Sequence, residues 1–248
     1  MLSVALLLTL AQTAPRPNAT LRAGLDTLYA GHFEHAAQYF AQLAAQDTSD
    51  AAPLVFQAGA YIWWASALDS ARFEEPRIDS LLAAAIARAQ RHRPSAEFWL
   101  ATAYGYRARE RDLHGHTWGA ARDAKQMRDA YARVLAADST CTDCYLGLGV
   151  YHYGLGRAGA LARFIARLIG LGSGDAAQGI TYLRRVAHDG DVARVEATWV
   201  LAAALAREAE RDERGRAVLR QEARNYVVRL AERYPANPVF QRFLTEVQ

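Results

Sequence analysis

Two cysteines form the most compact group of side chains that could do chemistry. Cys141 and Cys144 are the only cysteines of the chain and stand in the run C-T-D-C. A zinc ribbon needs a second such pair, and haem attachment needs a histidine where Tyr145 stands, so both are excluded. In an oxidising compartment the pair could form a local disulfide or a redox pair, because a helix N-terminus lowers a thiol pKa. The competing interpretation is two small apolar residues at a helix start.

A second group occurs in D-L-H-G-H, where Asp112, His114 and His116 could supply ligands to a metal ion. Two imidazoles and a carboxylate are sufficient in principle for a catalytic zinc. The helical pattern H-E-x-x-H is absent, as are the phosphate-binding loop and the nucleophile elbow. We therefore expect solvated loop histidines, no metal, no cofactor and no enzymatic activity. A metalloenzyme built on this loop is an alternative.

Composition limits the class of partner. The chain has 248 residues, with 29 basic and 26 acidic side chains interleaved along it and a formal net charge of +3. Nucleic-acid binding needs a one-sided basic density that this pattern lacks. We expect no nucleic-acid partner.

The N-terminus has the features of an exported protein. An apolar run from Val4 to Ala11 is followed by small residues and then by Pro15 and Pro17. This pattern predicts a signal peptide over residues 1–14 and a mature domain over 15–248, located in the periplasm or cell envelope. The alternative is a frayed first helix in a cytoplasmic protein. The run is too short to span a membrane.

The elements that must position these side chains are helices in a repeated arrangement. Turn-forming residues recur at 48, 94, 140, 190 and 236, at intervals of 46, 46, 50 and 46 residues. Between the turns the apolar residues follow a helical period, without strand alternation. The expected helix pairs are 21–29 with 33–45, 54–68 with 78–90, 96–109 with 120–136, 144–153 with 176–187, and 192–210 with 217–233, before a short last helix from Pro238.

The first unit, G-H-F-E-H-A-A-Q-Y-F, resembles the tetratricopeptide repeat. Gly31, Phe33, Ala36 and Phe40 stand where that family has its turn glycine, aromatic, small packing residue and second aromatic. Y-L-G-L-G-V-Y-H (145–152) is similar to the W-x-x-L-G-x-x-Y of the first repeat helix. The period of 46 departs from the family's 34, so a HEAT-like repeat is a competing assignment.

A longer resemblance covers residues 120–243. A-A-R-D-A-K, G-S-G-D-A-A-Q-G-I-T-Y-L-R-R-V-A and R-Y-P-A-N-P-V-F occur there in that order and resemble exported bacterial tetratricopeptide proteins. The resemblance implies an all-α, right-handed solenoid of helical hairpins. In such arrays the first helix of each pair lines the concave face, which implies a groove for a protein or peptide partner. The candidate groove residues are Trp63, Tyr104, Arg107 and Tyr153.

An additional segment, Gly156 to Asp175, divides the fourth pair. At 3.6 residues per turn its large apolar residues share one stripe, with Arg163 and Arg167 opposite. We expect an inserted amphipathic helix over about residues 157–171, ended by glycines, with Asp175 capping the next helix. The stripe is short, which favours packing across the solenoid over lying on a membrane surface. The stripe consists of Leu161, Phe164, Ile165, Leu168 and Ile169.

Together these features predict a non-catalytic interaction scaffold of the cell envelope that holds a protein or peptide partner in its concave groove. The alternative is a peripheral membrane module anchored by residues 156–175.

Overall fold

The computed structural model describes residues 19–247, and every regular element in that range is an α-helix. The prediction of an all-α fold is confirmed for this part of the chain. The predicted signal peptide, residues 1–14, lies outside the described residues. The helices are α1 (Ala19–Tyr29), α2 (Phe33–Gln46), α3 (Ala52–Ala67), α4 (Glu75–Arg91), α5 (Glu97–Leu113), α6 (Thr117–Ala137), α7 (Cys144–Arg157), α8 (Ala160–Leu168), α9 (Ala176–Asp189), α10 (Arg194–Arg211), α11 (Arg216–Arg233) and α12 (Pro238–Glu246).

The helices pack in consecutive pairs. α1 packs with α2, α3 with α4, α5 with α6, α7 with α9, and α10 with α11, and each pair packs on the next. These are the five pairs expected from the spacing of the turns, and α12 is the expected last helix. A helix with one apolar stripe needs a neighbour to cover it, so adjacent pairs bury each other's apolar surface.

The turns that follow α2 and α6 are closed by the same pair of side-chain hydrogen bonds. The Asp47 carboxylate accepts hydrogen bonds from the backbone N–H and the hydroxyl of Ser49, at 2.8 and 2.6 Å. The Asp138 carboxylate accepts the same two bonds from Thr140, at 2.9 and 2.5 Å. An aspartate that closes its own turn competes with helix continuation. The turn-forming residues that recur in the sequence at Asp47 and Asp138 therefore form the same local structure.

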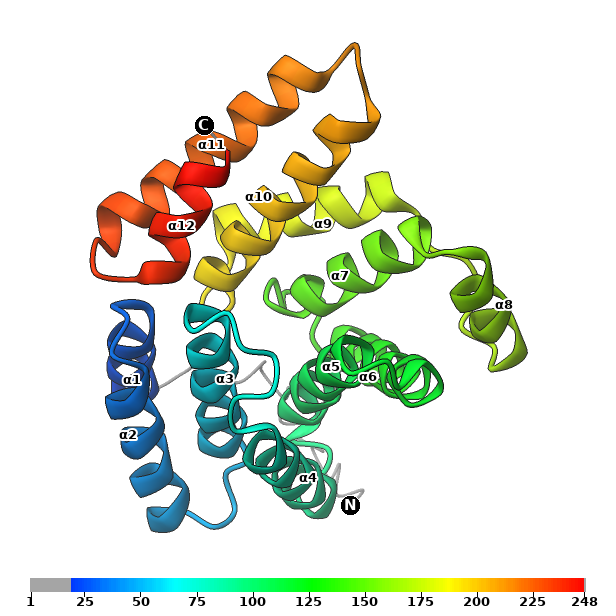
Figure 1. The fold of residues 1–248 in the computed structure, drawn as a ribbon. Helices are drawn as coiled ribbons and strands as arrows, with labels where there is room; N and C mark the ends of the chain where they lie inside the picture. The colour runs from blue at the N-terminus through cyan, green and yellow to red at the C-terminus, as the bar shows by residue number, and fades with distance from the viewer. Residues whose placement is uncertain (1–18, 248) are drawn as a thin grey trace, which may run out of the picture.

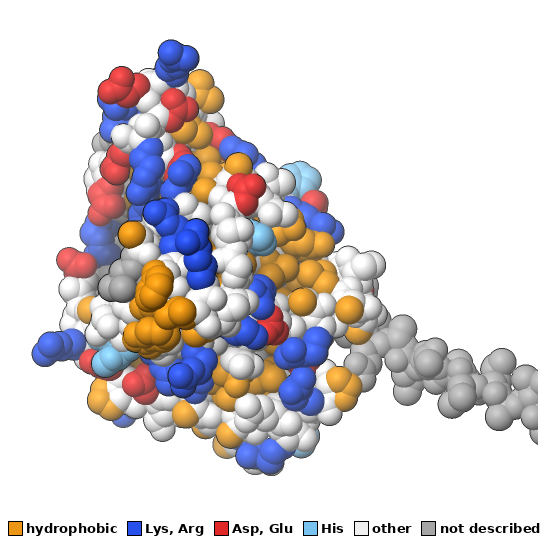
Figure 2. Space-filling model, turned by 90° about the vertical axis from the view of Figure 1, so that its right-hand side faces the viewer, with side chains coloured by type: hydrophobic (Ala, Val, Ile, Leu, Met, Phe, Trp, Pro, Cys, Tyr) orange, Lys and Arg blue, Asp and Glu red, His pale blue; other side chains and the backbone are white. Residues whose placement is uncertain are grey.

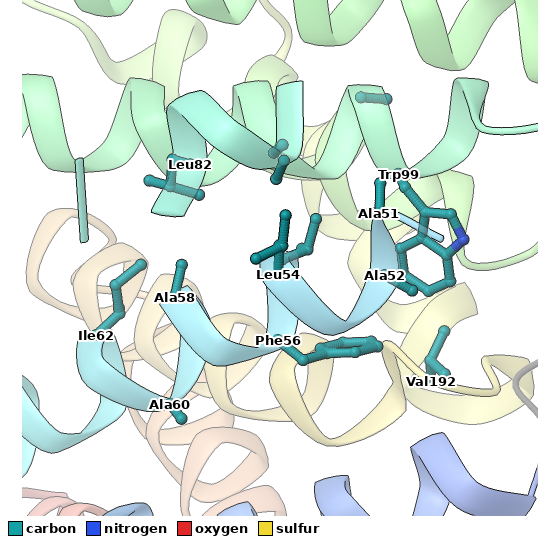
Figure 3. Close-up of a cluster of buried hydrophobic side chains, with 14 of the residues drawn as sticks. Ala51, Ala52, Leu54, Phe56, Ala58, Ala60, Ile62, Leu82, Trp99 and Val192 are labelled. Atoms are coloured by element: carbon teal, nitrogen blue, oxygen red, sulfur yellow. The ribbon is translucent and has the colours of Figure 1, made fainter. Parts of the chain in front are cut away.

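The core is centred on α3, which is buried on nearly every side. Its buried residues run almost without interruption from Ala52 to Trp63. Figure 3 shows Leu54 and Ala60 on opposite sides of the helix, and the ring of Phe56 lies 5.3 Å from that of Trp99 on α5. A helix that is apolar all round must be enclosed by others. Here α1, α2, α4, α5 and α12 all contact it.

Between α7 and α9 the chain leaves the paired helices, forms α8, and returns to a position close to the one it left. A Cβ on Gly156 would lie 2.7 Å from the backbone nitrogen of Ala176, and a Cβ on Gly174 would lie 2.7 Å from the carbonyl oxygen of His152. Only glycine permits so close an approach of two backbones. The segment between these glycines is a side excursion, and its helix packs against α6 (Figure 1).

The ends of the described chain meet, so the pairs run round a closed circle (Figure 1). The side-chain amide of Asn237, before α12, donates to the carbonyl oxygen of Tyr29 at 2.9 Å. Arg22 of α1 pairs with Asp191, before α10, at 2.5 Å. Arg242 of α12 donates to the carbonyl oxygen of Ser66 at 2.5 Å. We call this junction of α1 and α3 with α10, α11 and α12 the seam.

Candidate docking helix and the ring interior

The aromatic residues predicted to line an open groove lie in the interior. Trp63, Tyr104 and Tyr153 are 6%, 9% and 9% exposed. The Trp63 ring lies 5.5 Å from the rings of both Trp199 and Phe240, across the seam. We therefore correct their assignment to an open binding surface. For Trp63 the reason is the closure of the circle, which brings the rings of α10 and α12 against it. Tyr153 is instead covered by α10, where its hydroxyl donates to a backbone carbonyl and a glutamate, and Tyr104 contacts the adjacent helix α4.

Arg107, the fourth predicted groove residue, belongs to an ion pair within the α5–α6 hairpin. Its Nε and Nη2 atoms donate to the Asp123 carboxylate at 2.7 and 2.8 Å, and Arg111 donates to the same group at 2.6 Å. Asp123 is only 2% exposed. The hydrogen bond to Asp123 raises the pKa of Arg107, so its charge is committed to this pair. Removing the arginine would leave the buried Asp123 carboxylate without a partner, which costs free energy. Arg107 therefore stabilises the fold.

Glu196 and Tyr106 meet inside the ring, and no motif or spacing in the sequence indicates this pair. The Tyr106 hydroxyl of α5 donates to Glu196 Oε2 of α10 at 2.7 Å. Burial raises the pKa of the Glu196 carboxyl, while the Tyr106 hydrogen bond and the charge of Arg109 oppose that rise. Nearby on α10, the indole nitrogen of Trp199 is buried without a hydrogen-bond partner among the described residues. The pair provides a polar contact between distant hairpins.

The histidines of the D-L-H-G-H loop are not assembled with other ligands. His114 Nδ1 lies 3.6 Å from a carboxylate oxygen of Glu75, and the other ring nitrogen of His114 is buried without a partner in the described chain. Over residues 19–247, no three His, Cys, Asp or Glu side chains are grouped closely enough to hold a metal ion. Asp112 and His116 therefore do not complete a site with His114.

Cys141 and Cys144 are joined by a disulfide at the start of α7. They are 3% and 0% exposed, so neither sulfur faces a reaction partner. Asp143, inside this loop, accepts hydrogen bonds from the backbone N–H groups of Asp191 at 2.7 Å and Val192 at 3.1 Å. Burial raises the pKa of Asp143, and these bonds lower it by less. The disulfide loop thus holds the turn that carries Asp191 to the seam.

The stripe predicted on the inserted helix is divided between two environments. Ile165 is 2% exposed and Ile169 is half-buried against the core, as expected for packing. Phe164 and Leu168 are 56% and 60% exposed, so the prediction that the whole stripe packs inward is wrong. Periodicity placed the five residues on one side of the helix, but α6 covers only part of that side. The side chain of Leu161 lies outside the described structure.

Phe164 and Leu168 share their exposed surface with two arginines. Arg163 and Arg167 are exposed, and at 3.6 residues per turn these four positions span about 140° of the helix circumference. We call them the docking face. Seen from the side of α8, Figure 2 shows a compact group of hydrophobic side chains bordered by basic ones.

Asp175 caps α9, because its side chain accepts hydrogen bonds from the backbone N–H groups of Ala177 and Gln178. The prediction that Asp175 caps this helix is confirmed.

The chain has no match among protein-family models, curated proteins or solved structures. No helix within residues 19–247 is long and apolar enough to cross a membrane.

Proposed function

We propose that this protein is a non-catalytic interaction module of the cell envelope, built as a right-handed tetratricopeptide-like array, which docks reversibly on an anionic membrane surface through the docking face of α8. This replaces a protein partner in a concave groove as the favoured function. The observation that supports it most directly is the exposure of Phe164 and Leu168 beside two arginines.

The charge pattern of the α8 segment favours an anionic partner. From Gly156 to Gly174 there are three arginines and no acidic residue. Arg157 is bound to Glu208 of α10, which leaves Arg163 and Arg167 on the exposed side. Arginine side chains beside an apolar pair match the phosphate groups and acyl boundary of an anionic bilayer. A neutral surface would give these two charges no counterpart.

The expected affinity is modest. Fully burying a Phe or Leu side chain contributes about 1.5–3 kcal/mol, so the exposed fractions of Phe164 and Leu168 contribute about 2.5 kcal/mol together. Each arginine near an anionic surface adds about 1 kcal/mol. The sum of about 4.5 kcal/mol corresponds to a dissociation constant of about 0.5 mM in accessible lipid. The face supports reversible binding, and an additional signal would be needed for permanent anchoring.

Vesicle sedimentation tests the proposal. The wild-type protein should sediment with phosphatidylglycerol-containing vesicles, less so in high salt, and not with vesicles of pure phosphatidylcholine. Phe164→Asp should abolish binding while leaving the melting temperature unchanged. Val218→Asp is the matched control, because Val218 of α11 is 71% exposed and lies outside α8.

Two results would overturn the proposal. Equal binding of wild type and Phe164→Asp would show that the docking face is not used. Absence of vesicle binding, together with a protein crosslinked at position 164, would show that the face binds a protein.

A further inference from the structure

The seam carries a half-open pocket of about 220 Å³, the seam cavity, which no element of the docking face touches and whose charged lining residues reach the solvent. Its walls come from α1, from the turn before α10 with the first residues of that helix, and from the end of α11. Arg22 and Asp191, on facing walls, are 169 positions apart in the chain. The cavity therefore exists only while the circle is closed. It is lined by Arg22, Leu25, Asp26, Tyr29, Asp191, Val192, Arg194, Val195, Arg233 and Tyr234.

The walls are held in place by contacts outside the cavity. The backbone of Asp191 is fixed by Asp143 of the disulfide loop, and the Asp191 carboxylate receives two bonds from Arg22 at 2.5 and 2.7 Å. Tyr29 and Tyr234 are 4% and 7% exposed, and their rings lie 6.0 Å apart. A cavity whose walls are already fixed loses little freedom when a ligand enters.

Three charged side chains of the lining, Arg194, Arg233 and Asp26, form no ion pair with another described residue. Arg194 uses only its Nε atom, donating to the Gly190 carbonyl oxygen at 2.7 Å, and the Arg233 guanidinium lies over the Tyr234 ring at 5.4 Å from its centre. Within residues 19–247, neither arginine has a carboxylate partner, and the Asp26 carboxylate has no hydrogen bond or ion pair. The cavity thus offers two guanidinium groups and one carboxylate to a ligand.

We infer that the seam cavity binds a small zwitterion of the amino-acid class, with its carboxylate on Arg194 and Arg233 and its ammonium group facing Asp26. Arginine binds carboxylates through paired N–H donors. A phosphate dianion would meet the Asp26 charge as well, and a simple cation would meet two guanidinium groups. Only a ligand with both charges satisfies all three side chains.

The size of the cavity sets the size of the ligand. The cavity is smaller than the roughly 300–1,000 Å³ of drug-sized sites. A free amino acid with a small side chain fits this space. Because the ligand would contact α1, α10 and α11 together, it binds the closed circle and stabilises it by mass action.

Calorimetry and thermal melting of the whole protein test this inference with L-alanine as the probe. N-acetyl-L-alanine lacks the ammonium group and L-alaninamide lacks the carboxylate, so each should bind at least tenfold more weakly than L-alanine. Asp26→Asn should lose tenfold or more in L-alanine affinity and discriminate less against the acetylated probe. Arg233→Met should lose tenfold and discriminate less against the amide. Both residues are exposed at their helix surfaces, so these variants should fold.

Arg229→Met is the matched control. Arg229 lies one turn earlier on α11 and is also stacked on a tyrosine, Tyr226, at 4.7 Å, but it does not line the cavity. It should bind L-alanine as the wild type does. Inorganic phosphate binding more tightly than L-alanine would overturn the inference, as would no heat and no melting shift up to about 20 mM L-alanine, where even a 1 mM site is nearly saturated. Neither result bears on vesicle binding by α8.

Discussion

Replacing Asn237 tests whether closure of the circle contributes to stability. Asn237 is fully buried, and its side chain makes two bonds with different roles. Its amide nitrogen donates to the Tyr29 carbonyl oxygen across the seam at 2.9 Å. Its amide oxygen caps α12 by accepting from the N–H of Val239 at 3.0 Å. Asn237→Ala removes both bonds.

The two losses can be estimated separately. An N-cap contributes about 1 kcal/mol, within a range of about 0.5–2 kcal/mol. A buried carbonyl left without a donor costs about 1–3 kcal/mol, which applies to Tyr29. Asn237→Ala should therefore lower the free energy of unfolding by about 2–5 kcal/mol, and the melting temperature by about 5–15 °C for a chain of this size.

Asn237→Ser separates the two terms. Serine caps a helix as well as asparagine does, but its hydroxyl is too short to reach the Tyr29 carbonyl. Urea unfolding should place this variant between the wild type and Asn237→Ala. If Asn237→Ala loses less than about 0.5 kcal/mol, the seam is not part of the cooperative structure, and the reasoning from its burial is refuted.

Three further predictions concern the interior. Because burial raises the pKa of Glu196, the folded state holds this proton more tightly than the unfolded state, and stability should fall as pH rises from the ordinary carboxyl pKa through the raised one. Glu196→Gln should remove that part of the pH dependence and stabilise the protein at neutral pH; an unchanged pH profile in urea titrations would contradict this. Replacing Cys141 and Cys144 together by alanine should cost about 2 kcal/mol, the loop-closure entropy of so short a ring, and leave a folded protein, as circular dichroism can show. Gly179→Val should prevent stable folding, since a Cβ there would lie 2.7 Å from the Gly149 carbonyl oxygen; a soluble, cooperatively melting variant would refute it.

Local features of this fold could be predicted from the sequence because their causes are local. Asp47, Asp138 and Asp175 each bond to backbone N–H groups two or three residues ahead, so a turn or cap is readable from a few letters. The same holds for the helical period, which gave the five pairs and the existence of α8. These predictions do not depend on which helices pack against each other.

The misassigned residues all depend on distant contacts. Helical periodicity gives the stripe of α8 but does not say that α6 covers Ile165 and leaves Phe164 exposed. The groove assignment of Trp63 failed because its partners, Trp199 and Phe240, are brought to it by closure. The pair of Tyr106 and Glu196 spans 90 positions, and no spacing rule connects residues so far apart.

The polar contacts of the seam explain why closure can be specific. Apolar surfaces at the two ends of a helical array could also pair between molecules, and such head-to-tail pairing produces open polymers. Directional bonds restrict that choice: Asn237 requires the Tyr29 carbonyl in one position, and Arg22 requires Asp191, which Asp143 holds in place. Asn237 is fully buried, whereas the Arg22–Asp191 pair is exposed to solvent and adds little stability, so its role is to restrict the geometry of closure. Because Asp143 lies between the two disulfide-bonded cysteines, the position of Asp191, and with it one wall of the seam cavity, is tied to the disulfide loop.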